Sequence, residues 1–140
     1  MEISQLIVDS LYTNSDIVKI FKVSNTGGMR RSRRTNSLVL ISKLSNAIES
    51  NPYEDKWVEG IFHYTGMGLK GNQELKGNQN FTLAESNKNG IDVYLFESSK
   101  PNEYNYRGKA QLYGEVYEVS EVGSNGQIRR VYKFPLKLID

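Results

Sequence analysis

Cysteine is absent from the 140-residue sequence, and histidine and proline are scarce, with one and three residues respectively. Without cysteine the chain has no disulfide framework and no thiolate zinc site, which is typical of proteins from a reducing compartment. A single histidine leaves almost no material for a histidine-rich metal site or a Ser-His-Asp triad. We therefore expect neither a metal nor another cofactor.

Long apolar runs are also missing. No stretch of the sequence approaches the roughly 20 apolar residues of a membrane-spanning helix. The first five residues lack the basic start and the apolar stretch of a signal peptide. We expect a cytoplasmic protein without a membrane partner, and the length predicts one domain over residues 1–140.

Negative charge is missing from one long window, because no acidic residue lies between Asp16 and Glu49. Removing the seven positive charges of this window from the net charge of +2 leaves the rest of the chain at −5. Such a basic segment on an acidic body is typical of a polyanion-binding protein, although a solvated basic loop without a partner is an alternative. The seven cations are Lys19, Lys22, Arg30, Arg31, Arg33, Arg34 and Lys43.

Two short helices are predicted. Ser15 is suited to cap the first, Asp16 is favourable at its N-terminus, and apolar residues follow at 17, 18, 20 and 21. Gly27 and Gly28 are expected to end it and to open an arginine loop. The second helix is predicted within residues 78–89 and ends at Gly90.

Most of the remaining sequence favours β-structure. Residues 37–42 form a continuous apolar run typical of a buried central strand, and other strands are predicted at 60–64, 91–96, 104–122 and 129–138. We expect a bend or bulge at Gly114 and a hairpin turn at 123–126. The predicted fold is a single α+β domain with a curved, barrel-like mixed β-sheet and a few short helices.

Five sequence elements occur in an order that is typical of one family. A glycine-containing segment precedes Ser-Leu-Val-Leu at 37–40, and Tyr-Glu-Asp follows at 53–55. An aromatic strand then ends in Tyr-Thr-Gly at 64–66, before a Gln-x-Leu element at 73–75 and Asn-x-x-Leu-Ala at 80–84. Over residues 27–97 this order resembles the SRA (SET- and RING-associated, or YDG) domain, which reads modified cytosine in DNA.

The glycine-rich forms of these motifs are most similar to the N-terminal domain of bacterial HNH endonucleases that restrict modified DNA. An HNH nuclease would need further histidines and usually cysteines, which this chain lacks. The resemblance therefore implies a PUA/SRA-like reader without a nuclease, from a type IV restriction system. Its expected partner is duplex DNA with 5-methylcytosine or 5-hydroxymethylcytosine, and an HNH domain is expected in the full-length protein.

The resemblance also implies a pocket for a base that is flipped out of the duplex. In the family two tyrosines sandwich the base, and the matching positions here are Tyr53 and Tyr64, with Trp57 as a substitute. A carboxylate of the family accepts a hydrogen bond from the cytosine amino group, but the matching position here is Lys56. Either Asp55 serves instead, or Lys56 contacts phosphate and the pocket prefers another base. The rest of the pocket is expected to be lined by Thr65, Gly66 and Met67.

The arginine segment falls where the family's chain approaches DNA. We assign its four arginines to phosphate contact or groove insertion, and Lys70 and Asn72 to the opposite side of the duplex. The four arginines are Arg30, Arg31, Arg33 and Arg34.

Several alternatives remain open at this stage. Tyr53 and Tyr64 are also typical of aromatics that only pack a sheet. The same fold class includes readers of modified RNA and of other DNA marks, such as sulfur in the backbone. A protein-interaction domain is a further candidate. A nuclease is disfavoured, because carboxylate-x-lysine patterns such as those at 54–56 and 74–76 arise freely by chance.

Overall fold

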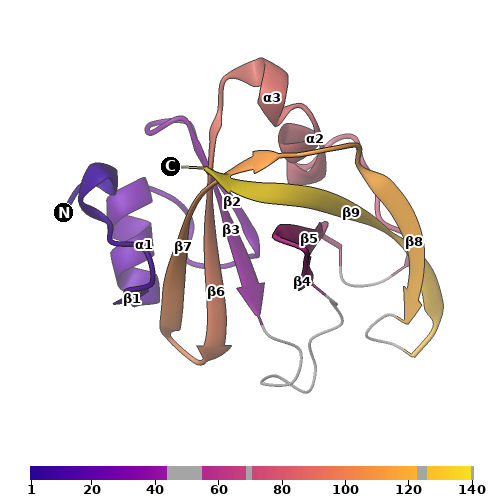
Figure 1. The fold of residues 1–140 in the computed structure, drawn as a ribbon, viewed down its shortest axis with the longest axis horizontal. Helices are drawn as coiled ribbons and strands as arrows, with labels where there is room; N and C mark the ends of the chain where they lie inside the picture. The colour runs from indigo at the N-terminus through magenta and orange to yellow at the C-terminus, as the bar shows by residue number, and fades with distance from the viewer. Residues whose placement is uncertain (44–54, 69–70, 123–125, 140) are drawn as a thin grey trace.

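A computed structural model describes residues 1–43, 55–68, 71–122 and 126–139 of the chain. Figure 1 shows a curved sheet with helix α1 on one flank, helices α2 and α3 above, and a long hairpin of β8 and β9 on the other flank. The strands are β1 (Leu11–Tyr12), β2 (Met29–Ser32), β3 (Ser37–Lys43), β4 (Lys56–Val58), β5 (Ile61–Thr65), β6 (Asp92–Lys100), β7 (Glu103–Leu112), β8 (Tyr117–Val122) and β9 (Ile128–Ile139). The helices are η1 (Ile3–Gln5, a 3-10 turn), α1 (Asn14–Phe21), α2 (Gln79–Ala84) and α3 (Ser86–Asn89).

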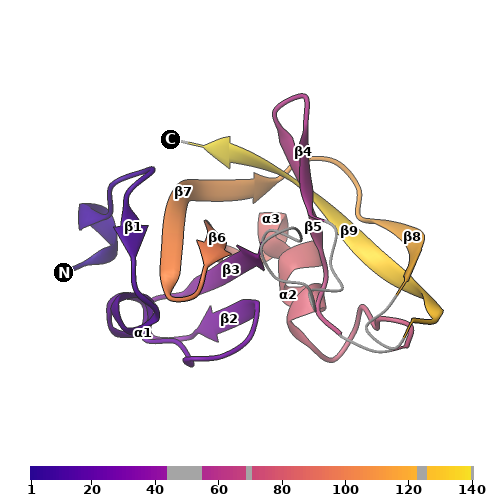
Figure 2. The same cartoon turned by 90° about the horizontal axis from the view of Figure 1, so that it is seen from below.

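The strands form one mixed sheet in the order β2-β3-β6-β7-β9-β5-β4, with β1 paired to β7 and β8 paired to β9. The β3–β6 pair is parallel, and the other pairs are antiparallel. The sheet curves strongly, as the view from below in Figure 2 shows, but it stays open, since no ladder joins β2 to β4 among the described strands. The predicted curved mixed sheet with a few short helices is confirmed.

Two apolar cores lie on opposite faces of the sheet because side chains alternate along each strand. On β3, Leu38 and Leu40 belong to the core that also holds Tyr64. Val39 and Ile41 belong to the other core, on which helix α1 packs. Burial on both faces explains why the β3 sequence is continuously apolar instead of alternating. The buried central strand predicted at 37–42 is confirmed.

Helix α1 begins two residues earlier than the sequence suggested. Thr13, and not Ser15, is the N-cap, and its hydroxyl accepts a hydrogen bond from the Asp16 amide while the Asp16 side chain accepts one from Thr13 N. This capping box satisfies two otherwise unpaired amides. The helix ends at Lys22, which adopts the left-handed conformation (φ 60°), well before Gly27.

The prediction that all four arginines lie in a loop is wrong, because two of them lie in a strand. Arg30 and Arg31 lie in β2, which pairs with β3 from Met29↔Leu40 to Ser32↔Ser37. Only Arg33 and Arg34 lie in the turn that joins the two strands. Strand β2 has no apolar alternation of its own, and its pairing with β3 determines its conformation.

The later elements agree with the sequence in kind and differ in detail. Helices α2 and α3 divide the predicted helical stretch, and Gly90 ends it in the left-handed conformation (φ 75°). The chain breaks into β7 and β8 around Gly114 (φ 109°), so the expected bend is a full interruption. Pairing of β8 with β9 confirms the hairpin, whose turn at 123–125 lies outside the described residues.

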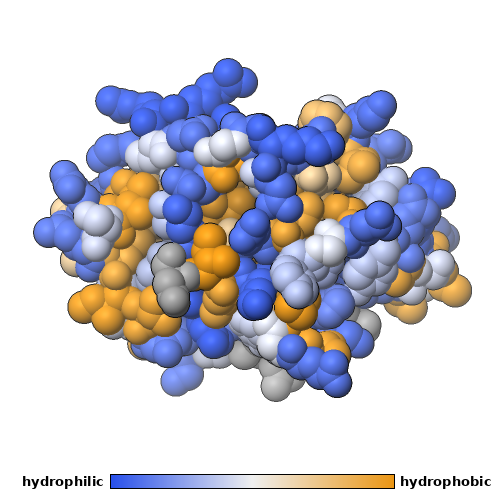
Figure 3. All heavy atoms as spheres, turned by 45° about the horizontal axis from the view of Figure 1, so that its top comes forward, coloured by the Kyte–Doolittle hydropathy of each residue, from blue (hydrophilic) through white to orange (hydrophobic). Residues whose placement is uncertain are grey.

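In the described parts of the chain, no helix combines the length and the apolar character that a membrane crossing requires. Hydrophilic atoms predominate along the upper edge of the face drawn in Figure 3, and apolar atoms form separate groups below it.

Candidate functional site

Tyr64 lies on β5 with its ring inside the core and only 3% of its surface exposed. Its hydroxyl donates to the carbonyl oxygen of Gly28 at 2.7 Å and lies 3.2 Å from that of Ile41. These contacts fix the ring against the open end of the β2–β3 hairpin. A Cβ atom at Gly28 would lie 3.3 Å from the Tyr64 hydroxyl, so the close approach favours glycine there. Tyr53, the other expected base wall, lies outside the described residues.

Asp55 points inward just before β4, and its carboxylate is held from two sides. Oδ2 accepts a hydrogen bond from the Ser42 hydroxyl at 2.6 Å, and Oδ1 accepts one from the Thr65 amide at 2.6 Å. Burial raises the pKa of Asp55 above its ordinary value, although these hydrogen bonds oppose the shift. The next residue, Lys56, is exposed. Of the two residues considered for the acidic position, only Asp55 faces the interior.

A buried ion pair adjoins this carboxylate. Lys133 on β9 donates to the hydroxyl oxygen of Thr65 at 2.6 Å and pairs with the carboxylate of Glu121 on β8 at 2.5 Å. The side chains of Lys133 and Glu121 are 7% and 8% exposed. A connected polar chain therefore runs from Ser42 through Asp55, Thr65 and Lys133 to Glu121.

Lys133 and Glu121 were missed at the sequence level. Val131 is fully buried, and Lys133 two residues later shares its face of β9. Strict alternation along β9 would have indicated an inward lysine. Nothing in the sequence indicates that a glutamate on a mostly exposed strand reaches it.

The turn after Tyr64 is held by two buried amide side chains. Asn80 accepts a hydrogen bond from the Met67 amide at 2.7 Å and donates to the Met67 carbonyl at 3.1 Å. Gln73 donates to the carbonyl oxygen of Gly66 at 2.5 Å. A Cβ atom at Gly66 would lie 2.7 Å from the Asn80 side-chain oxygen and 3.0 Å from that of Gln73, so only glycine fits. The Gln-x-Leu and Asn-x-x-Leu-Ala elements therefore act as the frame of this turn.

Trp57 is half-buried and is engaged on several sides. Its indole nitrogen donates to the Glu97 carboxylate at 3.3 Å, and its ring packs on Phe62 with the centroids 4.8 Å apart. The Arg107 guanidinium lies over the ring, 5.3 Å from its centroid. In this arrangement Trp57 packs β4 against β6 and β7, whereas the sequence had suggested it as a substitute wall of the base pocket.

The arginines separate into buried and exposed members. Arg30 is 5% exposed and donates to the carbonyl oxygen of Gly27 at 2.8 Å and to the side-chain oxygen of Asn14 at 2.6 Å, and burial lowers its pKa. It supports the hairpin from within and does not present its guanidinium to a partner, contrary to its assignment to phosphate. Arg31 is half-buried, whereas Arg33 and Arg34 are exposed.

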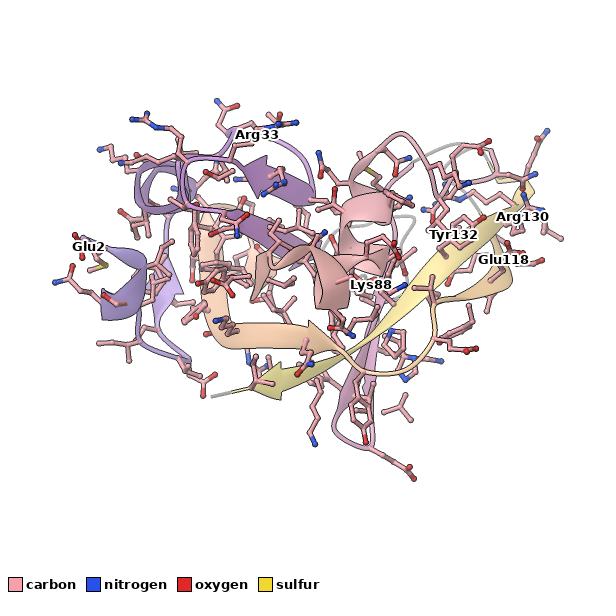
Figure 4. All side chains as sticks on the ribbon, turned by 90° about the horizontal axis from the view of Figure 1, so that it is seen from above. Glu2, Arg33, Lys88, Glu118, Arg130 and Tyr132 are labelled. Carbon is pink, nitrogen blue, oxygen red and sulfur yellow. The ribbon has the colours of Figure 1, made fainter. Side chains whose placement is uncertain are left out.

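The exposed arginines do not lie beside Tyr64. Tyr64 contacts the open end of the β2–β3 hairpin at Ile41, and the turn begins four residues along β3, beyond Ser37. At about 3.3 Å per residue the two ends are roughly 13 Å apart. Figure 4 shows Arg33 at the outer rim of the molecule.

The two remaining predicted contacts lie in or near the glycine-rich segment after β5. Asn72 is exposed, and its side-chain oxygen accepts a hydrogen bond from the Arg130 amide at 2.7 Å, which ties the segment to β9. Lys70 lies outside the described residues.

No metal site is evident in the described part of the chain, where no three potential histidine, cysteine or acidic ligands come together. The single histidine, His63, meets the hydroxyl of Tyr117 at 2.7 Å between its ring nitrogen Nδ1 and the phenol oxygen. It points away from the core that holds Phe62 and Tyr64, because side chains alternate along β5.

Comparison with known proteins gives a consistent result. Residues 9–140 match the family described as the ScoMcrA-like SRA domain. No curated protein has a matching sequence. Among solved structures, the sulfur-binding and SRA domains of ScoMcrA in complex with phosphorothioated DNA align with a TM-score of 0.76 and 17% identity, over 96% of this chain and 40% of that chain.

Two further structures share the fold. The DNA recognition domain of the cytosine modification-dependent restriction endonuclease LpnPI aligns with a TM-score of 0.72 and 21% identity, over 96% of this chain and 74% of that chain. The SUVH5 SRA domain bound to hemi-methylated CG DNA aligns with a TM-score of 0.66 and 20% identity, over 96% of this chain and 90% of that chain. The chain spans only 25% of the structure of the type IV restriction endonuclease ScoMcrA.

Proposed function

Because the chain belongs to the ScoMcrA-like SRA domain family, we propose that it reads a modified base in duplex DNA. The base, a modified cytosine, is held beside Asp55 and Tyr64 after it leaves the stack. The domain contributes recognition and no catalysis of its own. The resemblance found in the sequence motifs is confirmed at the level of the family.

One observation carries the choice of base: a buried carboxylate stands fixed beside the Tyr64 turn. Asp55 accepts hydrogen bonds from the Ser42 hydroxyl on one oxygen and from the Thr65 amide on the other. A carboxylate offers about four acceptor positions, which is more than its partners among the described residues use. The exocyclic amino group of cytosine is a hydrogen-bond donor, and a carboxylate is its usual protein partner.

Flipping the base costs a few kcal/mol, and stacking on an aromatic ring recovers about 1–3 kcal/mol per base. Tyr64 is one wall of the proposed pocket and Tyr53 the other. Since the ring of Tyr64 is 3% exposed, its stacking face has to be uncovered when the base enters. The framed turn at Thr65–Met67 and the inward Asp55 supply polar groups on the remaining side.

In its full-length context, we propose that the domain serves as the specificity module of a modification-dependent restriction endonuclease, joined to an HNH nuclease domain and acting on DNA in the bacterial cytoplasm. Two of the structures that share its fold are parts of restriction endonucleases.

Fluorescence anisotropy on matched short duplexes tests the proposal. Four duplexes are compared, each at two salt concentrations: unmodified, 5-methylcytosine, 5-hydroxymethylcytosine and phosphorothioate. Preference of tenfold or more for a methylated or hydroxymethylated duplex, about 1.4 kcal/mol, supports a base reader. Preference for the phosphorothioate duplex alone would assign the mark to the backbone, and equal affinities would return the pocket residues to a packing role.

A further inference from the structure

Four exposed cations from two separate elements form one surface, which we call the α1–turn patch: Lys19, Lys22, Arg33 and Arg34. We propose that this patch holds the phosphate backbone of duplex DNA independently of the base mark, at a distance from the Asp55–Tyr64 site. The inference rests on the proposed DNA binding and adds to it a second contact, of which two members come from helix α1.

Specific contacts build the patch. The Thr35 hydroxyl, in the β2–β3 turn, donates to the carbonyl oxygen of Phe21 at 3.0 Å, which brings the turn against the last residues of α1. Lys22 follows Phe21 directly and donates to the carbonyl oxygen of Lys19 at 2.7 Å. Figures 1 and 4 both place the turn beside α1, and Arg33 points outward there. The cations of the helix and the turn thus face solvent side by side.

These charges are not neutralised. In the described parts of the chain, none of the four patch cations forms an ion pair with a carboxylate. The nearest acidic residue along the sequence, Asp16, lies one helical turn before Lys19 and lines the same hollow as Lys19 and Lys22, but its carboxylate is bound in the capping box with Thr13. Four cations that form no ion pair beside this one engaged carboxylate still attract a polyanion, and arginine forks match phosphate oxygens in pairs.

The separation from the base site has a definite consequence. The patch lies at the turn end of the β2–β3 hairpin and Tyr64 at its open end, roughly 13 Å away. A contact at the patch therefore reaches phosphates and not the flipped base. Phosphate contacts position a protein on DNA but carry no base information. The patch raises affinity for modified and unmodified duplexes by the same factor.

The test uses two double variants, Lys19→Gln with Lys22→Gln on the helix and Arg33→Gln with Arg34→Gln in the turn. Anisotropy is measured against modified and unmodified duplexes over a range of salt. Each pair is expected to weaken both duplexes equally and to reduce the slope of log affinity against log salt by about 0.9 for each phosphate that is no longer bound, or about 2 per pair. The matched control is Lys100→Gln with Lys137→Gln, which removes two exposed lysines elsewhere and should change the slope less.

Each other outcome overturns the inference. An unchanged slope in the helix pair would leave only the turn as a DNA contact, and an unchanged slope in both pairs would leave the patch for an acidic protein partner. Weakening confined to the modified duplex would make the patch part of the base site. Circular dichroism and thermal melting verify that each variant is folded. If the wild type shows no preference among duplexes, the base-reader proposal fails, while the salt slopes still decide the patch.

Discussion

Replacing Asp55 by Asn separates a structural role of this carboxylate from a reading role. The asparagine side chain has nearly the same volume and keeps an oxygen that can accept from the backbone N–H of Thr65. In the wild-type structure that N–H lies 2.6 Å from Asp55 Oδ1. The Ser42 hydroxyl, which donates to Asp55 at 2.6 Å, can rotate and accept from the new amide group. We therefore expect Asp55→Asn to fold.

The cost in DNA binding comes from the removed charge. A hydrogen bond to a charged group contributes about 1.5–3 kcal/mol, roughly twice that of a neutral pair. Taking about 2 kcal/mol, we expect roughly 30-fold weaker binding of the preferred modified duplex. Affinity for the unmodified duplex should change little, and anisotropy titrations measure both. A variant that retains the full preference would show that Asp55 does not read the base.

The same substitution has a second, independent readout in stability. Burial raises the pKa of Asp55 in the folded protein above its ordinary value of 3.8, so the folded chain holds this proton to higher pH than the unfolded chain does. In the window above pH 3.8 the unfolded chain loses the proton first, and the wild type loses stability as pH rises. The amide introduced by Asp55→Asn does not titrate, so the variant gains stability relative to the wild type through this window.

Urea denaturation at several pH values measures this gain. Asp92→Asn provides the control, because Asp92 is a partly exposed carboxylate paired with Lys109 at 2.9 Å and lies outside the proposed pocket. The control should leave the preference among duplexes intact. If the free energy of unfolding changes with pH in the same way for Asp55→Asn and the wild type, burial does not raise the pKa of Asp55.

Three further predictions concern the frame of the site and are measured by chemical denaturation. Lys133→Met leaves the Glu121 carboxylate buried without its cation and should cost about 3–5 kcal/mol, and adding Glu121→Gln should restore part of it. Tyr64→Phe removes a buried hydroxyl donor and should cost about 1–2 kcal/mol, whereas an unchanged midpoint would show that the carbonyls find other donors. Gly66→Ala should cost about 1–3 kcal/mol and exceed the loss in Gly28→Ala, since the nearest contact of the added carbon is 2.7 Å in one case and 3.3 Å in the other.

The sequence predicts the long strands well because their apolar patterns extend over enough residues. Strands β3, β6 and β9 each have seven or more residues and carry a continuous or alternating apolar run. Strands β1, β2 and β4 have two to four residues, too few for any periodicity to appear. These short strands form because each one hydrogen-bonds to a longer neighbouring strand. That pairing is a tertiary interaction, which the local sequence does not reveal.

The candidate site divides in the same way. The motif elements around Tyr64, Gln73 and Asn80 were found because they are contiguous or closely spaced. The pairing of Thr65 with Lys133 crosses 68 residues of sequence, and a single lysine in a strand has no feature that reveals its partner. For Arg30 the sequence suggested a function that the structure does not support. Its position among other arginines suggested a phosphate contact, but its side chain points to the buried side of β2.

The two groups of charges have different electrostatic tasks. At the proposed base site two carboxylates, Asp55 and Glu121, stand against one ammonium, Lys133, so with all three ionised this buried cluster carries one net negative charge. Such a cluster suits a base amino group and repels phosphate. The roughly 13 Å to the β2–β3 turn exceeds the screening length of about 8 Å at physiological ionic strength. Salt therefore screens the exposed cations of the α1–turn patch over this distance, although it screens the buried cluster less. In the proposed binding mode, attraction of the DNA and discrimination of its bases depend on different residues and can be adjusted separately.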